Sequence, residues 1–412
     1  MAPPCGGAHG AYPMSFFAPR LNRIKHSPSN AATQKVRELR AQGRDIIGLT
    51  IGEPDFPTPD NVKRAVVEAM ARDETRYTTV DGTDEMKDAA RLKFKRENGL
   101  DYGRDQITVA NGAKQIVFNA MMATLTPGDE VIIPAPYWVS YLDMALVADG
   151  TPVAVACSED NGFKLTPAQL EAAITPRTKW LVINSPCNPS GAVYSRAELA
   201  ALAEVLLRHP QVWILTDDIY EHLLFDNREF ATIAKVEPRL YERTLTVNGV
   251  SKAYSMTGWR IGYAGGSKDL IRNMAKLQSQ STSNPSSISQ AAAVEALTGP
   301  QEYVHMRALE FQERRDVVVP MLNAAPGLSC RTPEGAFYAY PNCSRLLGLK
   351  TPEGKTIVNE QDFALYMLDN GVAGIQGEAY GLSPYVRLSI ATDLASLREA
   401  CQRIQRACAA LS

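Results

Sequence analysis

Apolar and polar positions follow two alternating periods from about residue 30 onward. Short runs rich in Val, Ile and Leu lie at 45–51, 106–110, 130–135, 151–156, 180–184, 212–217, 244–249 and 260–266. Between them apolar residues recur at helical spacing, as Val62, Val66 and Met70 do after the Pro59–Asp60 helix start. Short apolar strands separated by helices are typical of a mostly parallel sheet with helices on both faces. The pattern therefore predicts an α/β fold with its ligand site at the carboxyl ends of the strands.

The pattern changes at about residue 285. A long helical stretch over 303–322 precedes strand-like segments at 335–341, 372–375 and 385–390, and a last helix begins near 393. This order predicts a second, smaller α+β domain. We expect a flexible leader at 1–20, an N-terminal arm and part of the small domain at 21–58, a large domain at 59–298 and a small C-terminal domain at 299–412. The leader has neither the basic start nor the apolar core of a secretory signal, and Met14 is an alternative start.

Composition and charge narrow the classes of partner. The 412 residues include 43 basic and 45 acidic side chains, a balance that gives no reason to expect a nucleic-acid or membrane partner. No apolar run approaches the ~20 residues of a spanning helix. Seven cysteines without a C-x-x-C pair suit reduced thiols in the cytoplasm, and five histidines without ligand spacing give no metal site.

A lysine after a buried strand candidate is the first candidate for chemistry. Lys252 follows the run at 244–249, and burial there would lower the pKa of its amine toward the reactive neutral form. Arg260 could supply a planar, doubly donating partner for a phosphate. A lone lysine is more often a surface residue, but the whole segment 250–263 resembles the cofactor-lysine region of class I pyridoxal-phosphate-dependent aminotransferases. The resemblance implies that Lys252 holds pyridoxal 5′-phosphate as a Schiff base and that Arg260 binds its phosphate.

Two more strand ends carry residues of this family pattern. Segment 184–191 is similar to the family's Asn-x-Pro-x-Asn-Pro-x-Gly loop, which implies that Asn188 contacts the cofactor's phenolic oxygen and the substrate. Segment 216–220 implies that Asp217 faces the pyridine nitrogen and that Tyr220 lies beside Asn188. A buried carboxylate would keep that nitrogen protonated, so that the ring accepts electrons. Asp218 is the alternative acid, and we expect it to be a solvated side chain at the strand end.

The phosphate and the ring need further contacts. Gly112 allows a tight turn between a strand and a helix, whose free N–H groups suit a phosphate. The resemblance assigns main-chain donation to Ala113 and Lys114. It also places Trp138 against the cofactor ring and the substrate, although a tryptophan there could otherwise be a core residue.

Substrate contacts complete the resemblance. Arg387 lies inside the strand-like segment 385–390, where a charge is costly unless it is paired, and it matches the arginine that grips the substrate α-carboxylate. Gly52 in segment 51–56 would line the substrate site with its backbone. Tyr77 matches a tyrosine that reaches the partner's phosphate, which implies a homodimer with shared sites. Lys114 and Lys25 match lysines that recognise a distal carboxylate, although both could be solvated surface lysines.

These matches resemble most closely the bacterial aspartate (aspartate/prephenate) aminotransferase branch and imply fold type I. The expected function is a ping-pong transfer of an amino group from L-aspartate to 2-oxoglutarate, with prephenate as a further acceptor. Departures at Ile51, Gly374 and Tyr380 leave an aromatic or other amino-acid aminotransferase open as an alternative. A pyridoxal-phosphate lyase and a non-enzymatic regulator also remain open.

Overall fold

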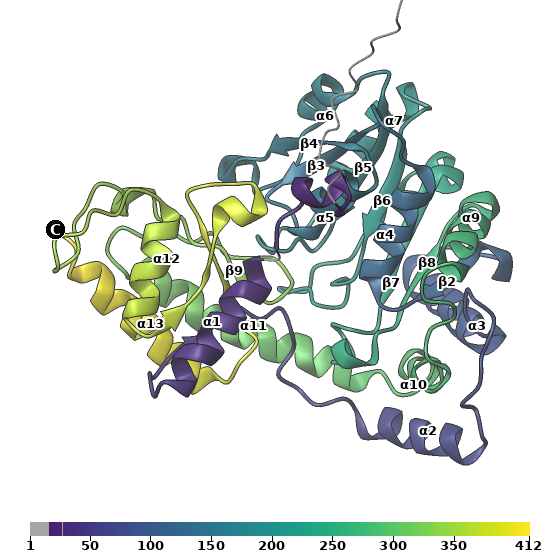
Figure 1. Cartoon of the computed structure of the whole chain (residues 1–412), viewed down its shortest axis with the longest axis horizontal. Helices are drawn as coiled ribbons and strands as arrows, with labels where there is room; N and C mark the ends of the chain where they lie inside the picture. Colours follow the sequence, from purple (N-terminus) through teal and green to yellow (C-terminus); the bar gives the residue numbers. More distant parts are fainter. Residues whose placement is uncertain (1–15, 27) are drawn as a thin grey trace, which may run out of the picture.

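A seven-stranded sheet forms the larger part of the molecule (Figure 1). The computed structural model describes residues 16–26 and 28–412. The strand order is β2-β8-β7-β6-β5-β3-β4. Their bounds are β2 (Ile107–Ala110), β3 (Glu130–Ala135), β4 (Thr151–Ala156), β5 (Thr178–Asn184), β6 (Trp213–Asp217), β7 (Thr244–Gly249) and β8 (Gly262–Gly265). All neighbours pair in parallel except β8, which is antiparallel to both β2 and β7. The predicted α/β class with a mostly parallel sheet is confirmed.

Helices cover both faces of this sheet because the side chains of each strand alternate between two apolar cores. Val131 and Ile133 of β3 pack in one core with α4 (Ala113–Thr124), α5 (Ser140–Val147) and α9 (Lys268–Ser279). Ile132 packs in the opposite core with α6 (Pro167–Ala173), α7 (Arg196–Arg208) and α8 (Ile233–Val236). This period of two is what a strand buried on both faces requires. A further core near β2 holds α2 (Asp60–Ala71), α3 (Asp84–Lys93) and α10 (Ser287–Thr298).

The smaller part contains two short sheets. Strands β11 (Ile375–Gln376), β12 (Val386–Ser389) and β9 (Tyr338–Ala339) are antiparallel, and β1 (Ile47–Gly48) pairs in parallel with β10 (Val372–Ala373). Around them lie α1 (Pro28–Ala41), α11 (Glu302–Asn323), α12 (Glu360–Asp369) and α13 (Leu394–Ala409). The apolar run at 45–51, first of the alternating series, thus joins the small part and not the large sheet. Its β1 is only two residues long.

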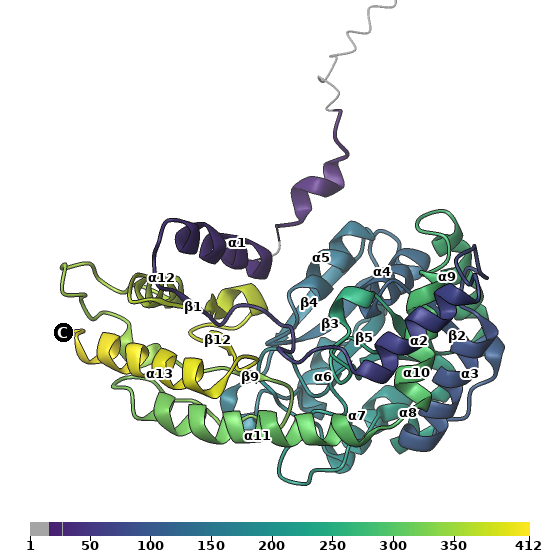
Figure 2. The same cartoon turned by 90° about the horizontal axis from the view of Figure 1, so that it is seen from below.

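The two parts lie side by side, with α11 running from beside α13 toward α10 (Figures 1 and 2). Short helical turns complete the chain: η1 (Pro19–Arg23), η2 (Phe94–Asn98), η3 (Arg104–Gln106), η4 (Glu159–Asn161), η5 (Pro238–Arg243), η6 (Thr257–Trp259), η7 (Ser344–Leu346) and η8 (Gly377–Tyr380). The leader expected over 1–20 falls largely outside the described residues, as does Met14. No helix within residues 16–26 and 28–412 is both long enough and apolar enough to span a membrane.

Candidate active site

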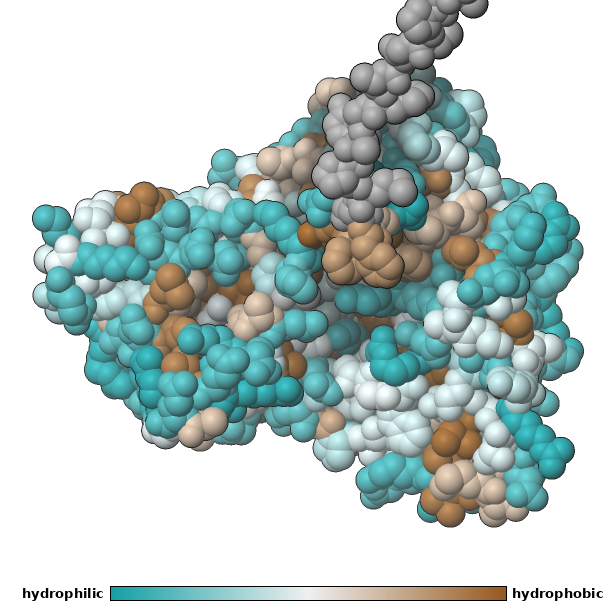
Figure 3. All heavy atoms as spheres, in the orientation of Figure 1, coloured by the Kyte–Doolittle hydropathy of each residue, from teal (hydrophilic) through white to brown (hydrophobic). Residues whose placement is uncertain are grey.

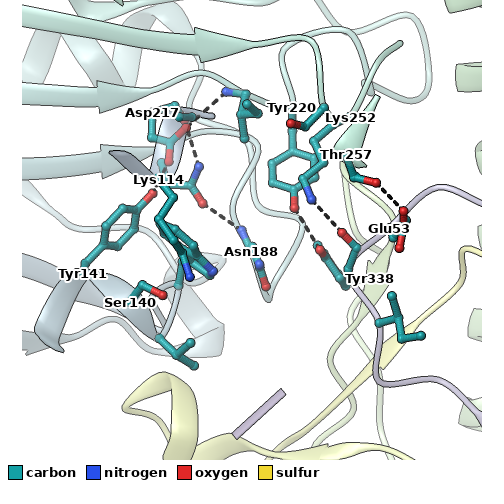
Figure 4. Close-up of a pocket in the computed structure, with 18 of the residues that line it drawn as sticks. Glu53, Lys114, Ser140, Tyr141, Asn188, Asp217, Tyr220, Lys252, Thr257 and Tyr338 are labelled. Carbon is teal, nitrogen blue, oxygen red and sulfur yellow. Dashed lines mark hydrogen bonds between the residues drawn. The ribbon is translucent and has the colours of Figure 1, made fainter. Parts of the chain in front are cut away.

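A cavity of about 320 Å³ opens at the carboxyl ends of β5, β6 and β7, between the two parts of the molecule. Its volume falls within the ~300–1,000 Å³ that is usual for small-molecule sites. Of the twelve residues expected at the site, ten line it: Gly52, Ala113, Lys114, Trp138, Asn188, Asp217, Tyr220, Lys252, Arg260 and Arg387. Figure 4 shows how several of their side chains converge. Residues from distant segments meet here because adjacent parallel strands end at one edge of the sheet.

Lys252 follows β7 and reaches into the cavity (Figure 4). Its Nζ donates a hydrogen bond to the Gly52 carbonyl at 2.6 Å and lies 5.7 Å from the centre of the Tyr220 ring. Burial lowers the pKa of the amine to about 8, and the positive charge of Arg387 acts in the same direction. A neutral, nucleophilic amine is therefore accessible near neutral pH.

Asp217 is the last residue of β6 and is buried against the cavity. Its Oδ2 accepts a hydrogen bond from the Tyr141 hydroxyl at 2.6 Å, and its Oδ1 accepts one from the Ile219 backbone N–H at 3.4 Å. Burial raises the pKa of the carboxyl, while the bond from Tyr141 and the charge of Lys252 oppose that rise. A buried acid held in this way can pair with a protonated ring nitrogen.

Asp218 differs from its expected environment. It is only 1% exposed and does not line the cavity, so the expectation of a solvated acid is wrong. Its Oδ1 accepts a hydrogen bond from the Thr216 hydroxyl at 2.5 Å, and burial raises its pKa to about 7. Successive side chains at a strand end point to opposite sides, which takes Asp218 away from the cavity that Asp217 faces.

An asparagine that was not among the expected site residues links two strand ends. Asn184 ends β5, and its Nδ2 donates to the Asp217 carbonyl at 2.8 Å. Its Oδ1 accepts from the Asn188 backbone N–H at 2.9 Å. The side chain thereby fixes the loop of Asn188 relative to β6. Asn184 is the first residue of the family-like segment 184–191, so its place in that segment could have indicated a role at the site.

Arg387 projects from β12 and is 2% exposed. Its Nη2 donates to the Thr50 carbonyl at 2.6 Å and its Nη1 to Asn188 Oδ1 at 3.2 Å, while the Nε has no hydrogen-bond partner within the described chain. The guanidinium lies 4.6 Å from the ring centre of Tyr338 and 5.1 Å from that of Tyr380. None of its contacts in residues 16–26 and 28–412 is an ion pair with a carboxylate. A buried cation without a counter-ion is costly, so this arginine is suited to receive an anion from outside the chain.

The opposite end of the cavity has the donors of a phosphate site. Arg260 adopts a left-handed conformation (φ 57°), and its Nη1 donates to the Thr257 carbonyl at 2.9 Å. Gly112 has φ +87°, which favours glycine, and a Cβ there would lie 2.3 Å from Arg260 Nη2 and displace the guanidinium from this position. Within the described structure no side chain caps the start of α4, where Ala113 and Lys114 lie. A helix start beside a guanidinium is suited to a phosphate.

Two tyrosines at the site were not expected there. Tyr141 donates to Asp217, and its ring meets Trp138 edge-on at 5.1 Å. The Tyr338 hydroxyl forms a hydrogen bond with the Tyr220 hydroxyl at 2.8 Å (Figure 4). Tyr141 lies three residues after Trp138, in the first turn of α5. Tyr338 had no local signal beyond an aromatic residue in a strand.

The remaining expected residues differ in position. Lys114 lines the cavity with its Nζ 5.0 Å from the centre of the Trp138 ring, and burial lowers the pKa of its amine. Lys25 and Tyr77 lie outside the cavity. The Lys25 side chain is 82% exposed and its Nζ lies 3.7 Å from Glu378 Oε1. Tyr77 is 93% exposed.

Comparisons with known proteins show the family of the chain. Residues 44–404 match the family model described as Aminotransferase class I and II. An aspartate/prephenate aminotransferase of Cereibacter sphaeroides is 60% identical over 97% of the chain and 100% of its own length. An aspartate aminotransferase of Rhizobium meliloti is 56% identical over 96% of this chain and 97% of its own length.

Solved structures of aspartate aminotransferases have a similar fold. The crystal structure of a Rhizobium meliloti aspartate aminotransferase superposes with a TM-score of 0.94 at 56% identity, covering 96% of this chain and 99% of that one. The aspartate aminotransferase of Thermus thermophilus with maleate gives a TM-score of 0.89 at 42% identity, over 96% and 100% of the two chains.

Proposed function

The chain belongs to the aminotransferase class I and II family, and from that premise we propose that it moves an amino group from L-aspartate to 2-oxoglutarate with pyridoxal 5′-phosphate as cofactor. The observation that carries this proposal is the buried guanidinium of Arg387, which has no carboxylate partner in the described chain. Every amino-acid and 2-oxo-acid substrate brings an α-carboxylate that can supply the missing charge.

The cavity fits the cofactor group by group. Arg260 and the start of α4 would hold a phosphate, Asp217 would hold a proton on the ring nitrogen, and Lys252 presents an amine with a pKa of about 8. Asn188 and Tyr220 line the space between them, where a phenolic oxygen would lie. Bound there, pyridoxal phosphate would supply an aldehyde and a ring that accepts electrons from the substrate Cα.

The side chains around the cavity then have separate tasks. Arg387 binds the α-carboxylate and so fixes the substrate amine and Cα relative to Lys252. The Lys252 amine, once free, would move a proton between the substrate Cα and the C4′ carbon of the cofactor, for which a pKa near the working pH is effective. Trp138 would cover the ring face.

The choice of a dicarboxylic substrate rests on Lys114 and on the relatives. Lys114 lines the cavity with its ammonium over the Trp138 ring, where it can bind a second carboxylate. Lys25 is the other candidate for that contact. The relatives are named for aspartate and for prephenate, and the Thermus thermophilus structure contains the dicarboxylate maleate. Prephenate also carries two carboxylates and is therefore a second acceptor to test.

We further propose a homodimer that works in the cytoplasm, with Tyr77 reaching the cofactor phosphate of the partner. Apolar surface gathers over α2 in Figure 3, where Val67 is 61% and Met70 45% exposed. Tyr77, in the segment that follows α2, is 93% exposed. A second copy covering this face would bury all three. We also propose that the large domain begins after about residue 58 and ends at about residue 298.

The test is a pair of half-reactions on the purified protein with pyridoxal phosphate. We expect L-aspartate and L-glutamate to convert the cofactor to its amine form, and 2-oxoglutarate and prephenate to restore it. L-phenylalanine should react much more slowly, since it offers no second carboxylate to Lys114. Conversion by L-phenylalanine with none by L-aspartate would contradict the dicarboxylate assignment and favour an aromatic aminotransferase.

A further inference from the structure

The end of β6 and the segment after it have some side chains that line the cavity and one, Glu221, that is buried away from it. Asp217, Ile219 and Tyr220 line the cavity, whereas Glu221 does not. Glu221 is nevertheless 5% exposed. A buried carboxylate without a role in the cavity must be compensated by charge and hydrogen bonds elsewhere.

That compensation comes from a buried cluster centred on Lys93, which we call the Lys93 cluster: Lys93, Asn98, Glu221 and Asn248. Lys93 is completely buried, and its Nζ pairs with Glu221 Oε1 and donates to Asn98 Oδ1 at 2.7 Å. Glu221 also accepts from Asn98 Nδ2 at 2.6 Å and from Asn248 Nδ2 at 2.8 Å. Both carboxylate oxygens of Glu221 are thus bonded, and Glu221 links its own segment to those of Lys93 and Asn248.

The local backbone is shaped around this contact. Lys93 ends α3, and the π-helical turn η2 (Phe94–Asn98) follows it directly. Such turns are rare and often mark functional positions. The turn brings Asn98 back against Lys93, while Glu97 Oε2 lies 3.5 Å from Nζ. Glu97, Glu221 and His222 place ligand atoms within 4.8 Å of one another, a spacing that would suit a cation. The Lys93 ammonium contacts both carboxylates and so supplies that charge from the chain itself.

The cluster reaches the active site through the two segments it joins. Glu221 is the residue after Tyr220, and Asn248 is four residues before Lys252, at the end of β7. β6 and β7 are parallel neighbours in the sheet, and the Asp218 N–H donates to the Val247 carbonyl at 2.9 Å. A shift of Glu221 or Asn248 would therefore move the backbone that carries Tyr220 and Lys252.

We propose that Lys93 is a positioning residue for transamination, which through Glu221 and Asn248 holds Tyr220 and Lys252 at the distance and angle that the cofactor requires. The inference rests on the proposed function, because these two residues matter in this way only if the cofactor binds between them. Lys93 itself does not line the cavity. Positioning errors of about 1 Å can cost about a hundredfold in rate, so a remote buried pair can have a large effect.

The test compares Lys93→Met/Glu221→Gln with the parent and with Lys87→Met. The double variant removes the ammonium without leaving a buried charge unpaired, which favours folding. Lys87 is the matched control: it lies on the same helix, is 8% exposed and pairs with Asp81 at 2.6 Å, and within residues 16–26 and 28–412 its ammonium has no hydrogen bond or ion pair to Glu221 or Asn248. Four quantities are measured: the thermal midpoint of the cofactor-free protein, the dissociation constant of pyridoxal phosphate, the circular dichroism of the bound cofactor, and kcat with L-aspartate and 2-oxoglutarate.

We expect the double variant to bind pyridoxal phosphate about tenfold or more weakly, with an altered dichroic band, and to lose between about ten- and a hundredfold in kcat. Lys87→Met should stay within about twofold of the parent in affinity and kcat, even if its thermal midpoint falls. An unchanged dissociation constant and dichroic band in the double variant, or equal losses in Lys87→Met, would overturn the inference. A parent that binds no pyridoxal phosphate would instead contradict the proposed function itself, and the inference with it.

Discussion

Removing the guanidinium of Arg387 tests how the site binds its substrate. A guanidinium has five N–H donors, and the described chain uses one on Thr50 and one on Asn188. Three donors, including the unpaired Nε, therefore remain for a carboxylate. A bidentate contact uses two of them, and hydrogen bonds to charged groups contribute about 1.5–3 kcal/mol each. Arg387→Leu should then weaken transition-state binding by about 3–6 kcal/mol, which is roughly a 10²- to 10⁴-fold loss in kcat/KM.

The assay is the rate of cofactor conversion by L-aspartate in a single half-reaction, in the parent and in three variants. The loss in kcat/KM should be smaller for Arg387→Lys than for Arg387→Leu, because an ammonium keeps the positive charge but not the planar, doubly donating geometry of a guanidinium. Arg315→Lys is the matched control: Arg315 is 3% exposed and lies 4.9 Å from the Phe225 ring centre, but it already pairs with Asp226. That variant should lose stability and keep its kcat/KM.

A substrate without a carboxylate separates binding from misfolding. We expect a simple primary amine to react slowly with the parent and at the same rate with Arg387→Leu. This role of Arg387 is refuted if Arg387→Leu stays within about threefold of the parent toward L-aspartate. It is refuted equally if the rate of Arg387→Leu falls by the same factor toward the simple amine as toward L-aspartate.

Three other predictions concern the groups around the cofactor. Asp217→Asn should still bind pyridoxal phosphate but lose about 10²- to 10³-fold in kcat, because a neutral amide cannot hold the ring nitrogen protonated; a kcat near that of the parent would exclude this role. Tyr141→Phe removes the 2.6 Å hydrogen bond that opposes the rise in the pKa of Asp217, and it should weaken cofactor binding by about ten- to a hundredfold in an absorbance titration. The rate of cofactor loading should increase about tenfold from pH 7 to pH 9 in stopped-flow absorbance, because the neutral amine of Lys252 reacts and its pKa is lowered from 10.5 to about 8. A rise of about a hundredfold over the same interval, with no levelling toward pH 9, is what the ordinary lysine pKa would give and would contradict the lowered pKa.

The large sheet and most of the site could be predicted from the sequence, because both depend on local patterns. Strands buried on both faces read as short apolar runs, and Asn188, Asp217 and Lys252 each follow such a run. Once three neighbouring strands are parallel, their following residues must meet at one edge. The motifs therefore indicated the position of the site before any long-range contact was known.

The features that were missed depend on contacts between distant segments. The run at 45–51 was expected in the N-terminal arm and small domain, but its pairing with β10, more than 320 residues further on, is encoded by no local pattern. Asp218 follows Asp217 directly, and only the direction of the strand decides which acid faces the cavity. Tyr338 reaches Tyr220 from the small sheet. Lys93 had no sequence signal, because a buried lysine and an exposed lysine at the end of a helix have the same sequence pattern.

The most direct test of the central claim is the absorbance spectrum of the protein mixed with pyridoxal phosphate, before and after L-aspartate is added. We predict a visible band from the cofactor bound to Lys252, which L-aspartate converts to the amine form and which 2-oxoglutarate restores. In Lys252→Ala the band of the lysine-bound cofactor should be absent and turnover lost. A parent without that band, or a Lys252→Ala variant that keeps both the band and the parental rate, would contradict the claim.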